Sequence, residues 1–194
     1  TAPPCTTRSR NMESADSRGI ILAPIRFPEE WVDAGMMEQL SIIFKKPVVR
    51  ETVHLELEDF YDPVRDQYHS TAILKHFILD QPAYGPKVCY LVQPDLFIPI
   101  LTFVFGEAHM HGRHCIVSSH RLREEYYMRS TDRDLFHKRL LKEIVHELGH
   151  TFGLIHCFDD LCVMHNSYDI SGTDRKQEFP CDMCFEKLDE LLRA

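Results

Sequence analysis

The stretch HELGHTFGLIH, residues 146–156, holds three histidines and a glutamate at regular spacing. His146 and His150 are four residues apart, so on a helix of 3.6 residues per turn both side chains lie on one face. Glu147 lies beside that face, where it is placed to hold a water molecule bound to a metal rather than the metal itself. The spacing therefore predicts a metal site built on a helix.

His156 can join this site only if the helix ends before it. On a continued helix it would lie roughly 9 Å beyond His150 along the axis, whereas a Zn–N bond is about 2.1 Å. Gly153 is the residue that can adopt the left-handed turn that such a break needs. Together these positions form H-E-x-x-H-x-x-G-x-x-H, which chance produces roughly once in ten thousand trials at this composition.

Three neutral imidazoles leave an open position on zinc, where the pKa of a water molecule falls to about 7. Glu147 would act as the general base, accepting the proton and passing it to the leaving amine, while zinc stabilises the oxyanion. We therefore predict a zinc-dependent metallopeptidase that acts on small proteins or peptides, with aminopeptidase action as one form of this activity. The alternative is a zinc-stabilised peptide- or protein-binding module with little or no turnover.

Four cysteines follow in two short-spaced pairs, C-x4-C and C-x2-C: Cys157, Cys162, Cys181 and Cys184. Two such pairs suit a closed, four-thiolate structural zinc site, so we expect two zinc ions in all. Two disulfides or unrelated thiols are the alternative. Cys89 and Cys115 fall in predicted strands and are expected in the core. Cys5 lies near the N-terminus. One interpretation is that its thiolate caps the catalytic metal, and the favoured interpretation is that it is an inert cysteine.

Residues 146–164, followed by CDMC at 181–184, resemble the archaemetzincins, a family of the metzincin clan. The family signature joins HExxHxxGxxH directly to a cysteine, then continues as C-x4-C-x-M and C-x-x-C, and every fixed position is present. YDPVRDQYHSTAIL and FGEAHMHGRHCIVSSHRL are also similar to upstream family segments. The resemblance covers residues 20–194.

The resemblance implies a metzincin-like α/β (α+β) fold, with a twisted mixed sheet, a long active-site helix and a small C-terminal subdomain stabilised by zinc. It also implies that Met164 is the Met-turn residue beneath the catalytic zinc. Some metzincins carry a tyrosine two residues after that methionine. Here Asn166 occupies the position and Tyr168 comes later, so assistance by a tyrosine is not expected.

Other chemistry-bearing residues are weaker candidates. His109, His111 and His114 in HMHGRH have metal-ligating side chains, but an exposed hairpin turn is the favoured interpretation. GEAHM, residues 106–110, resembles the edge strand that metzincins pair with an extended substrate, and an ordinary sheet edge is the alternative. Arg65 and Tyr68 are expected to be structural.

The composition excludes several classes of binding partner. The chain has 22 basic and 30 acidic residues, a formal net charge of −8, which argues against a protein that binds the nucleic-acid backbone. It has no run of about eighteen apolar residues, and residues 1–19 contain no apolar stretch typical of a secretory signal, so we expect no membrane contact and a cytoplasmic location. We expect a monomer.

Periodicity predicts one domain over residues 20–194 after a flexible arm at 1–19. We divide it into an upper subdomain, 20–153, and a lower subdomain, 154–194. The expected strands are 19–25, 47–57, 87–92, 101–110 and 113–119. The expected helices are 28–45, opened by Pro28, then 70–79, 131–153, capped by Thr131 with Asp134, and 180–194. Residues 58–70 are expected to form a loop, and 159–179 show no clear element.

Overall fold

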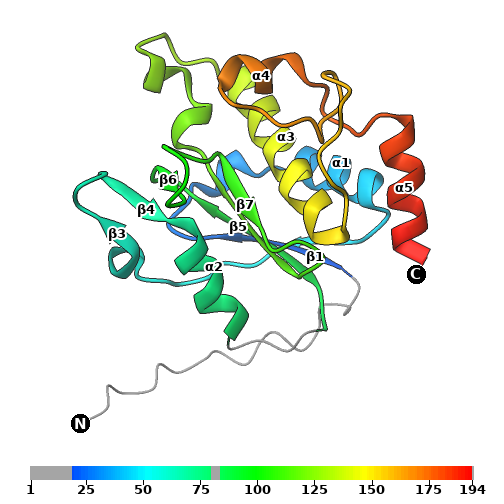
Figure 1. Ribbon diagram of the computed structural model, residues 1–194, viewed down its shortest axis with the longest axis horizontal. Coiled ribbons are helices and arrows are strands. Elements are labelled where there is room, and N and C mark those ends of the chain that lie inside the picture. Colours follow the sequence, from blue (N-terminus) through cyan, green and yellow to red (C-terminus); the bar gives the residue numbers. More distant parts are fainter. Residues whose placement is uncertain (1–18, 80–83, 194) are drawn as a thin grey trace.

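A five-stranded sheet forms the centre of the computed structural model, which describes residues 19–79 and 84–193. The strand order is β2-β1-β5-β8-β7, and all neighbours are parallel except β7 and β8 (Figure 1). The strands are β1 (Ile20–Pro24), β2 (Val48–Arg50), β5 (Lys87–Val92), β7 (Gly106–Ala108) and β8 (His114–Ser118). The antiparallel strand β7 lies at the edge.

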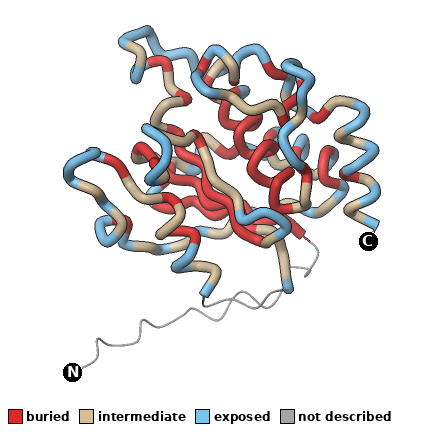
Figure 2. Tube along the Cα trace, in the orientation of Figure 1, coloured by how far each residue is buried: buried red, intermediate tan, exposed pale blue. Residues whose placement is uncertain are grey.

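Two apolar cores, one on each face of the sheet, hold it in place. In β1, Ile20 and Leu22 pack into one core, whereas Ile21 and Ala23 pack into the other, as the two-residue period of a strand requires. Figure 2 shows the central strands as buried, and among β1, β5 and β8 only Lys87 at the start of β5 is half-buried. This burial on both faces explains why β1, β5 and β8 read as continuous apolar runs.

The longer helices that contribute to the core on the first face are α1 (Ala34–Phe44), α3 (Arg133–Phe152) and α5 (Asp182–Arg193). The rings of Phe44 and Phe152 stack with centroids 5.1 Å apart and join α1 to the end of α3. The opposite face is covered by α2 (Ser70–Leu79) through Ile73 and Leu74. None of the helices in the described part of the chain is long and apolar enough to cross a membrane.

Shorter elements complete the fold. A second sheet has the order β3-β4-β6 and contains β3 (Tyr61–Asp62), β4 (Gln67–His69) and β6 (Leu96–Phe97). A six-residue helix, α4 (Ile170–Arg175), follows the motif region. Four 3-10 helices are η1 (Glu29–Trp31), η2 (Leu57–Phe60), η3 (His120–Leu122) and η4 (Glu124–Tyr127).

The predicted α/β class with a long motif helix is confirmed, but several predicted bounds are wrong. Pro28 precedes only the short η1, and α1 starts later because Asp33 caps it by accepting a hydrogen bond from Met36 N at 2.8 Å. The expected strands 47–57 and 101–110 shorten to β2 and β7. The expected loop 58–70 contains β3 and β4, and 159–179 contains α4. The expected arm, with Cys5, lies outside the described residues except for Gly19, whose carbonyl accepts a hydrogen bond from Lys87 N.

Candidate active site

The last turns of α3 carry the first two histidines of the motif. The helix begins after Asp132, whose Oδ1 accepts a hydrogen bond from Leu135 N at 2.9 Å, so the expected cap at Thr131 is wrong by one residue. It ends at Gly153, which has a left-handed φ of 107°. His146, Glu147 and His150 are all buried on this helix. The predicted break at Gly153 is confirmed.

The two helical histidines point the same ring nitrogen toward a common centre. His146 Nδ1 lies 2.8 Å from the carbonyl of Val163, and His150 Nδ1 lies 2.7 Å from that of Leu154. A carbonyl only accepts hydrogen bonds, so both Nδ1 atoms carry the proton and both Nε2 atoms present a lone pair. These Nε2 atoms are only 3.1 Å apart. Two facing lone pairs at this distance fit a bound cation, since two ligands on one zinc lie about 3.4 Å apart.

His156 joins the pair because the chain turns back after Gly153. Its ring centroid lies 5.3 Å from that of His146 and 4.8 Å from that of His150. The candidate ligand atoms of all three histidines lie within 4.8 Å of one another. Burial lowers the pKa of each of the three, which keeps the imidazoles neutral, as metal binding requires. The donor set therefore fits zinc.

A backbone contact with the turn between β7 and β8 fixes the C-terminal end of α3. The backbone N–H of His111, in the turn between β7 and β8, donates to the carbonyl of His150 at 3.2 Å. A Cβ on Gly153 would lie 2.7 Å from the His111 ring. Glycine is thus required here both by the left-handed backbone and by the close approach of this turn.

Met164 lies directly against the motif helix. It is fully buried, and a Cβ on Gly149 would lie 2.6 Å from its sulfur. The preceding residue, Val163, supplies the carbonyl that orients His146. The segment that contains Met164 therefore positions a candidate metal ligand through both its backbone and its side chain.

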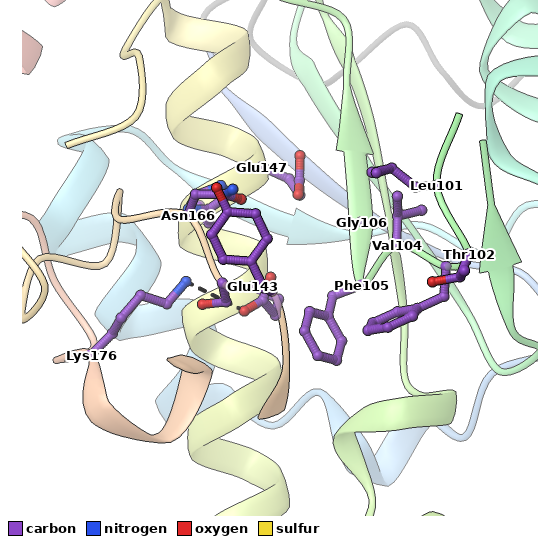
Figure 3. Close-up of a pocket in the computed structure, with 13 residues that line it drawn as sticks. Leu101, Thr102, Val104, Phe105, Gly106, Glu143, Glu147, Asn166 and Lys176 are labelled. Carbon is purple, nitrogen blue, oxygen red and sulfur yellow. Dashed lines mark ion pairs between the residues drawn. The ribbon is translucent and has the colours of Figure 1, made fainter. Parts of the chain in front are cut away.

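Glu147 faces a cavity of about 290 Å³ between α3 and the chain leading into β7 (Figure 3). Its carboxylate has no hydrogen bond or ion pair with any residue in the described part of the chain, and burial raises its pKa well above the usual value. A Cβ on Gly106 would lie 2.6 Å from Glu147 Cγ, so this glycine makes room for the side chain. Glu147 is therefore free to act on a molecule in the cavity.

The four cysteines after the motif form a second cluster, with all four sulfurs within 4.8 Å of one another. Cys157 Sγ and Cys181 Sγ are 3.8 Å apart, well beyond a disulfide bond of about 2.05 Å. Two thiolates bound to one zinc at about 2.3 Å lie about 3.8 Å apart, so the spacing fits a tetrahedral metal. The six described cysteines are all free, which argues against the disulfide alternative.

The two clusters meet at one peptide bond, since Cys157 directly follows His156. The N–H of Cys157 donates to the carbonyl of Met164 at 2.9 Å, and His165 Nδ1 donates to the carbonyl of Cys157 at 2.9 Å. Cys181 and Cys184 lie at the start of α5, and the N–H of Cys181 donates to Cys162 Sγ at 3.2 Å. The segment that carries His156 is thus joined to the last helix.

A family model described as Peptidase family M54 matches residues 41–190, more than half of the chain. The chain belongs to peptidase family M54, the archaemetzincins. The archaemetzincin of Pyrococcus abyssi is 45% identical over 179 residues, which cover 89% of this chain and 95% of that one. The archaemetzincin of Thermococcus kodakarensis is 33% identical, covering 88% and 95%. The resemblance seen in the sequence is confirmed.

Solved archaemetzincin structures share the fold. The crystal structure of archaemetzincin from Methanopyrus kandleri has a TM-score of 0.79 at 34% identity, covering 92% of this chain and 97% of that one. A zinc-dependent peptidase from Methanocorpusculum labreanum has a TM-score of 0.78 at 31% identity, covering 88% and 100%. The chain is accordingly a zinc-dependent peptidase by family, and its fold is that of the family.

The other candidate histidines and cysteines in the described part of the chain lie outside the cluster of His146, His150 and His156. His109, His111 and His114 do not come together as a metal-ligating group, and the first two lie exposed in the β7–β8 hairpin, as favoured above. Cys89 and Cys115 are fully buried opposite one another on β5 and β8, which confirms them as core residues.

Arg65 and Tyr68 make structural contacts. Arg65 donates to the carbonyl of Leu101 at 3.0 Å, and Tyr68 packs against Tyr61 on the neighbouring strand β3. Asn166 and Tyr168 both line the cavity. Neither residue was assigned a catalytic role from the sequence.

Three residues at the site were not singled out in the sequence, namely Gly149, Glu143 and Lys176, and Gly106 was noted only as part of the edge strand 106–110. Glu143 precedes Glu147 by one helical turn, so the 3.6-residue period could have placed it on the same face. Gly149 lies inside the motif, at a position where glycine weakens a helix unless close packing requires it. Lys176 approaches the site only through tertiary structure, and no local pattern indicates it. The contact of Gly106 with Glu147 likewise depends on tertiary structure, although the strand that contains Gly106 was expected near the substrate.

Proposed function

We propose that the chain hydrolyses peptide bonds at a zinc ion held by His146, His150 and His156, with Glu147 as the general base. The observation that carries this proposal is the pair of Nε2 atoms 3.1 Å apart, each made a lone-pair donor by a carbonyl on the opposite side of its ring. When bound, zinc supplies Lewis acidity that acidifies water and polarises a carbonyl group.

Glu147 moves the proton in this scheme. It lies outside the group of candidate ligand atoms, lines the cavity, and has no partner among the described residues that would hold its oxygens away from a substrate. Its carboxylate accepts a proton from the attacking water and returns it to the amine that leaves. The raised pKa favours the first of these steps, because a more basic carboxylate is a better proton acceptor.

The edge strand β7 is the proposed binding surface for the substrate backbone. It is the last strand of the sheet, and its first residue, Gly106, lines the cavity next to Glu147. An extended peptide can add to such an edge through main-chain hydrogen bonds. The substrate class we propose is therefore an extended peptide or a small protein segment.

We further propose that Cys157, Cys162, Cys181 and Cys184 hold a structural zinc ion, with no open position and no part in the reaction. The 3.8 Å spacing of Cys157 Sγ and Cys181 Sγ supports this role. Residues 20–194 would then form one peptidase domain, with an upper part at 20–153 and a lower part at 154–194.

Comparison with a Glu147→Ala variant tests the function. Zinc-loaded protein is incubated with a peptide library, and cleavage is followed by mass spectrometry. The variant should retain the zinc content of the wild type while losing nearly all cleavage, because Glu147 transfers protons and does not ligate. Glu38→Ala, the same substitution on an exposed helical surface, should cleave normally. Equal cleavage by Glu147→Ala would refute the mechanism, and peptide binding without cleavage by the wild type would favour the binding-module alternative.

A further inference from the structure

The cavity beside Glu147 continues along α3 toward the N-terminal end of that helix. One turn before Glu147, Glu143 points into the cavity from the same side, and Lys176 reaches it from the segment after α4 (Figure 3). At about 290 Å³ the cavity is just smaller than the roughly 300–1,000 Å³ of small-molecule sites. It is thus sized for a single substrate side chain.

The polar end of this cavity is a buried ion pair. Lys176 Nζ lies 3.5 Å from Glu143 Oε1, and the two side chains are only 1% and 4% exposed. Lys176 also donates to the carbonyl of His165 at 3.2 Å, and Glu143 Oε1 accepts from the hydroxyl of Thr173 at 3.0 Å. Among residues 19–79 and 84–193, no group donates a hydrogen bond to Glu143 Oε2. One oxygen of this largely buried carboxylate, beside the cavity, is therefore left with acceptor capacity.

Apolar side chains line the opposite side of the cavity. Phe103 and Phe105 lie edge to face, with ring centroids 5.2 Å apart, and Leu101 and Val104 adjoin them. Aromatic rings of this kind favour another aromatic ring as their neighbour. The cavity thus has apolar walls, Glu147 at one end, and at the other end one charged pair whose net charge is zero.

We propose that this cavity binds a substrate side chain with an apolar, aromatic body and an uncharged hydrogen-bonding tip, tyrosine foremost, and that Glu143 and Lys176 determine this specificity. The proposal rests on the proposed peptidase function. A phenol hydroxyl can donate to Glu143 Oε2 and accept from Lys176 at the same time, which satisfies both members of the pair. Phenylalanine fills the walls but leaves this acceptor unpaired.

Charged side chains fit less well for an electrostatic reason. At the end of the cavity formed by Glu143 and Lys176 the two charges already cancel, so a carboxylate or ammonium group from the substrate would be a third buried charge there, with no counter-ion of its own. Such a group also loses its hydration on entry. The expected order of preference is therefore tyrosine, then phenylalanine, then glutamate and lysine.

Peptides that differ at one position test this order. A cleaved peptide is synthesised with Tyr, Phe, Glu or Lys at each position flanking the scissile bond, and kcat/KM is compared. A hydrogen bond to a charged group is worth about 1.5–3 kcal/mol, so Tyr should exceed Phe by about 10- to 100-fold at one position. Equal rates for Tyr and Phe, or a preference for Glu or Lys, would overturn the inference.

A double variant, Glu143→Leu with Lys176→Met, assigns the effect to the ion pair. It should reduce the Tyr-to-Phe ratio to about 1 while the Phe peptide is still cleaved, because both charges are removed together. The matched control is Glu190→Leu with Lys187→Met, which removes an exposed pair of the same two residue types on α5 and should leave the ratio unchanged. An unchanged ratio in the double variant would overturn the assignment.

Two further measurements keep the test decisive. If the double variant does not fold, Glu143→Gln replaces it and should still lower the Tyr-to-Phe ratio. Calorimetry with the Glu147→Ala protein measures peptide binding without cleavage and should show the same preference for Tyr. Failure of the wild type to cleave any peptide contradicts the proposed function alone, whereas equal binding of the Tyr and Phe peptides contradicts this inference alone.

Discussion

Two glycines determine how closely the chain approaches the candidate active site. Gly149 lets Met164 contact α3, and Gly106 leaves space for Glu147. The three histidines, the glutamate and Gly153 could be predicted from the sequence, because helical periodicity and bond lengths limit where they can lie. Gly106 and Lys176 could not, because their roles depend on contacts between segments far apart in the chain.

Gly149→Ala should destabilise the protein by about 1–3 kcal/mol, because the added Cβ would lie 2.6 Å from the sulfur of Met164 in a packed core. Unfolding in urea measures the loss. Gly35→Ala is the matched control, since its Cβ would meet its nearest neighbour at an ordinary 3.4 Å and alanine favours a helix. The prediction fails if the two variants are equally stable.

His114 gives the protein a specific sensitivity to acid. Burial and, to a smaller extent, the nearby charge of Arg113 lower its pKa to about 4. The unfolded chain therefore takes up this proton first, near pH 6.5, so stability falls as pH falls from 6.5 toward 4. Between pH 7 and 5 the loss from this residue is about 2 kcal/mol.

His114→Gln should remove that part of the pH dependence, because glutamine does not titrate. Free energies of unfolding for both proteins at pH 7 and pH 5 measure it. The difference between the proteins isolates His114, since the other histidines are common to both. Parallel losses with pH in the two proteins would show that His114 does not contribute.

At the scale of elements, α3 shows what local sequence resolves and what it leaves open. Its length and apolar face were predictable from periodicity, but its first residue was not. Thr131 and Asp132 are adjacent and both are good N-caps, so the choice depends on tertiary contacts. The hydroxyl of Thr131 is used elsewhere, since it donates to Glu125 Oε1 in η4 at 2.6 Å.

Asp132→Ala should cost about 0.5–2 kcal/mol of stability, because the N–H of Leu135 loses its acceptor at the start of α3. Thr131→Ala should cost less, as it removes only an exposed contact with Glu125. Thermal unfolding of the two variants ranks them. The reverse ranking would identify Thr131 as the effective cap.

At the scale of the whole molecule, polar contacts hold the C-terminal part against α3. Fully buried Arg139 forms two 2.6 Å hydrogen bonds to the carboxylate of Asp174 and a third, also 2.6 Å, to Glu124. Lys142 donates to the carbonyls of Thr173 and Asp174. Residues 159–179 lacked a predicted element because hydrophobic periodicity cannot reveal α4, which is held largely by these charges.

Cys184→Ser should lower the zinc content from two ions to about one per chain and reduce stability, because a closed metal site that joins the segment after α3 to α5 supplies folding free energy. Activity should also fall, through loosening of the segment that carries His156. Metal analysis and thermal unfolding measure both effects. Cys89→Ala, at a buried cysteine outside the cluster, is the control and should keep two ions. An unchanged metal content in Cys184→Ser would contradict the structural site.

The shared peptide bond between His156 and Cys157 has a consequence for metal uptake. An ion held by the four cysteines orders the backbone that presents His156, so a second ion at the histidines has less conformational entropy to lose. By thermodynamic reciprocity, each ion raises the affinity of the other site by the same factor. Loading is then cooperative between two chemically unlike sites, and under limiting zinc the population divides mainly into metal-free and fully loaded chains.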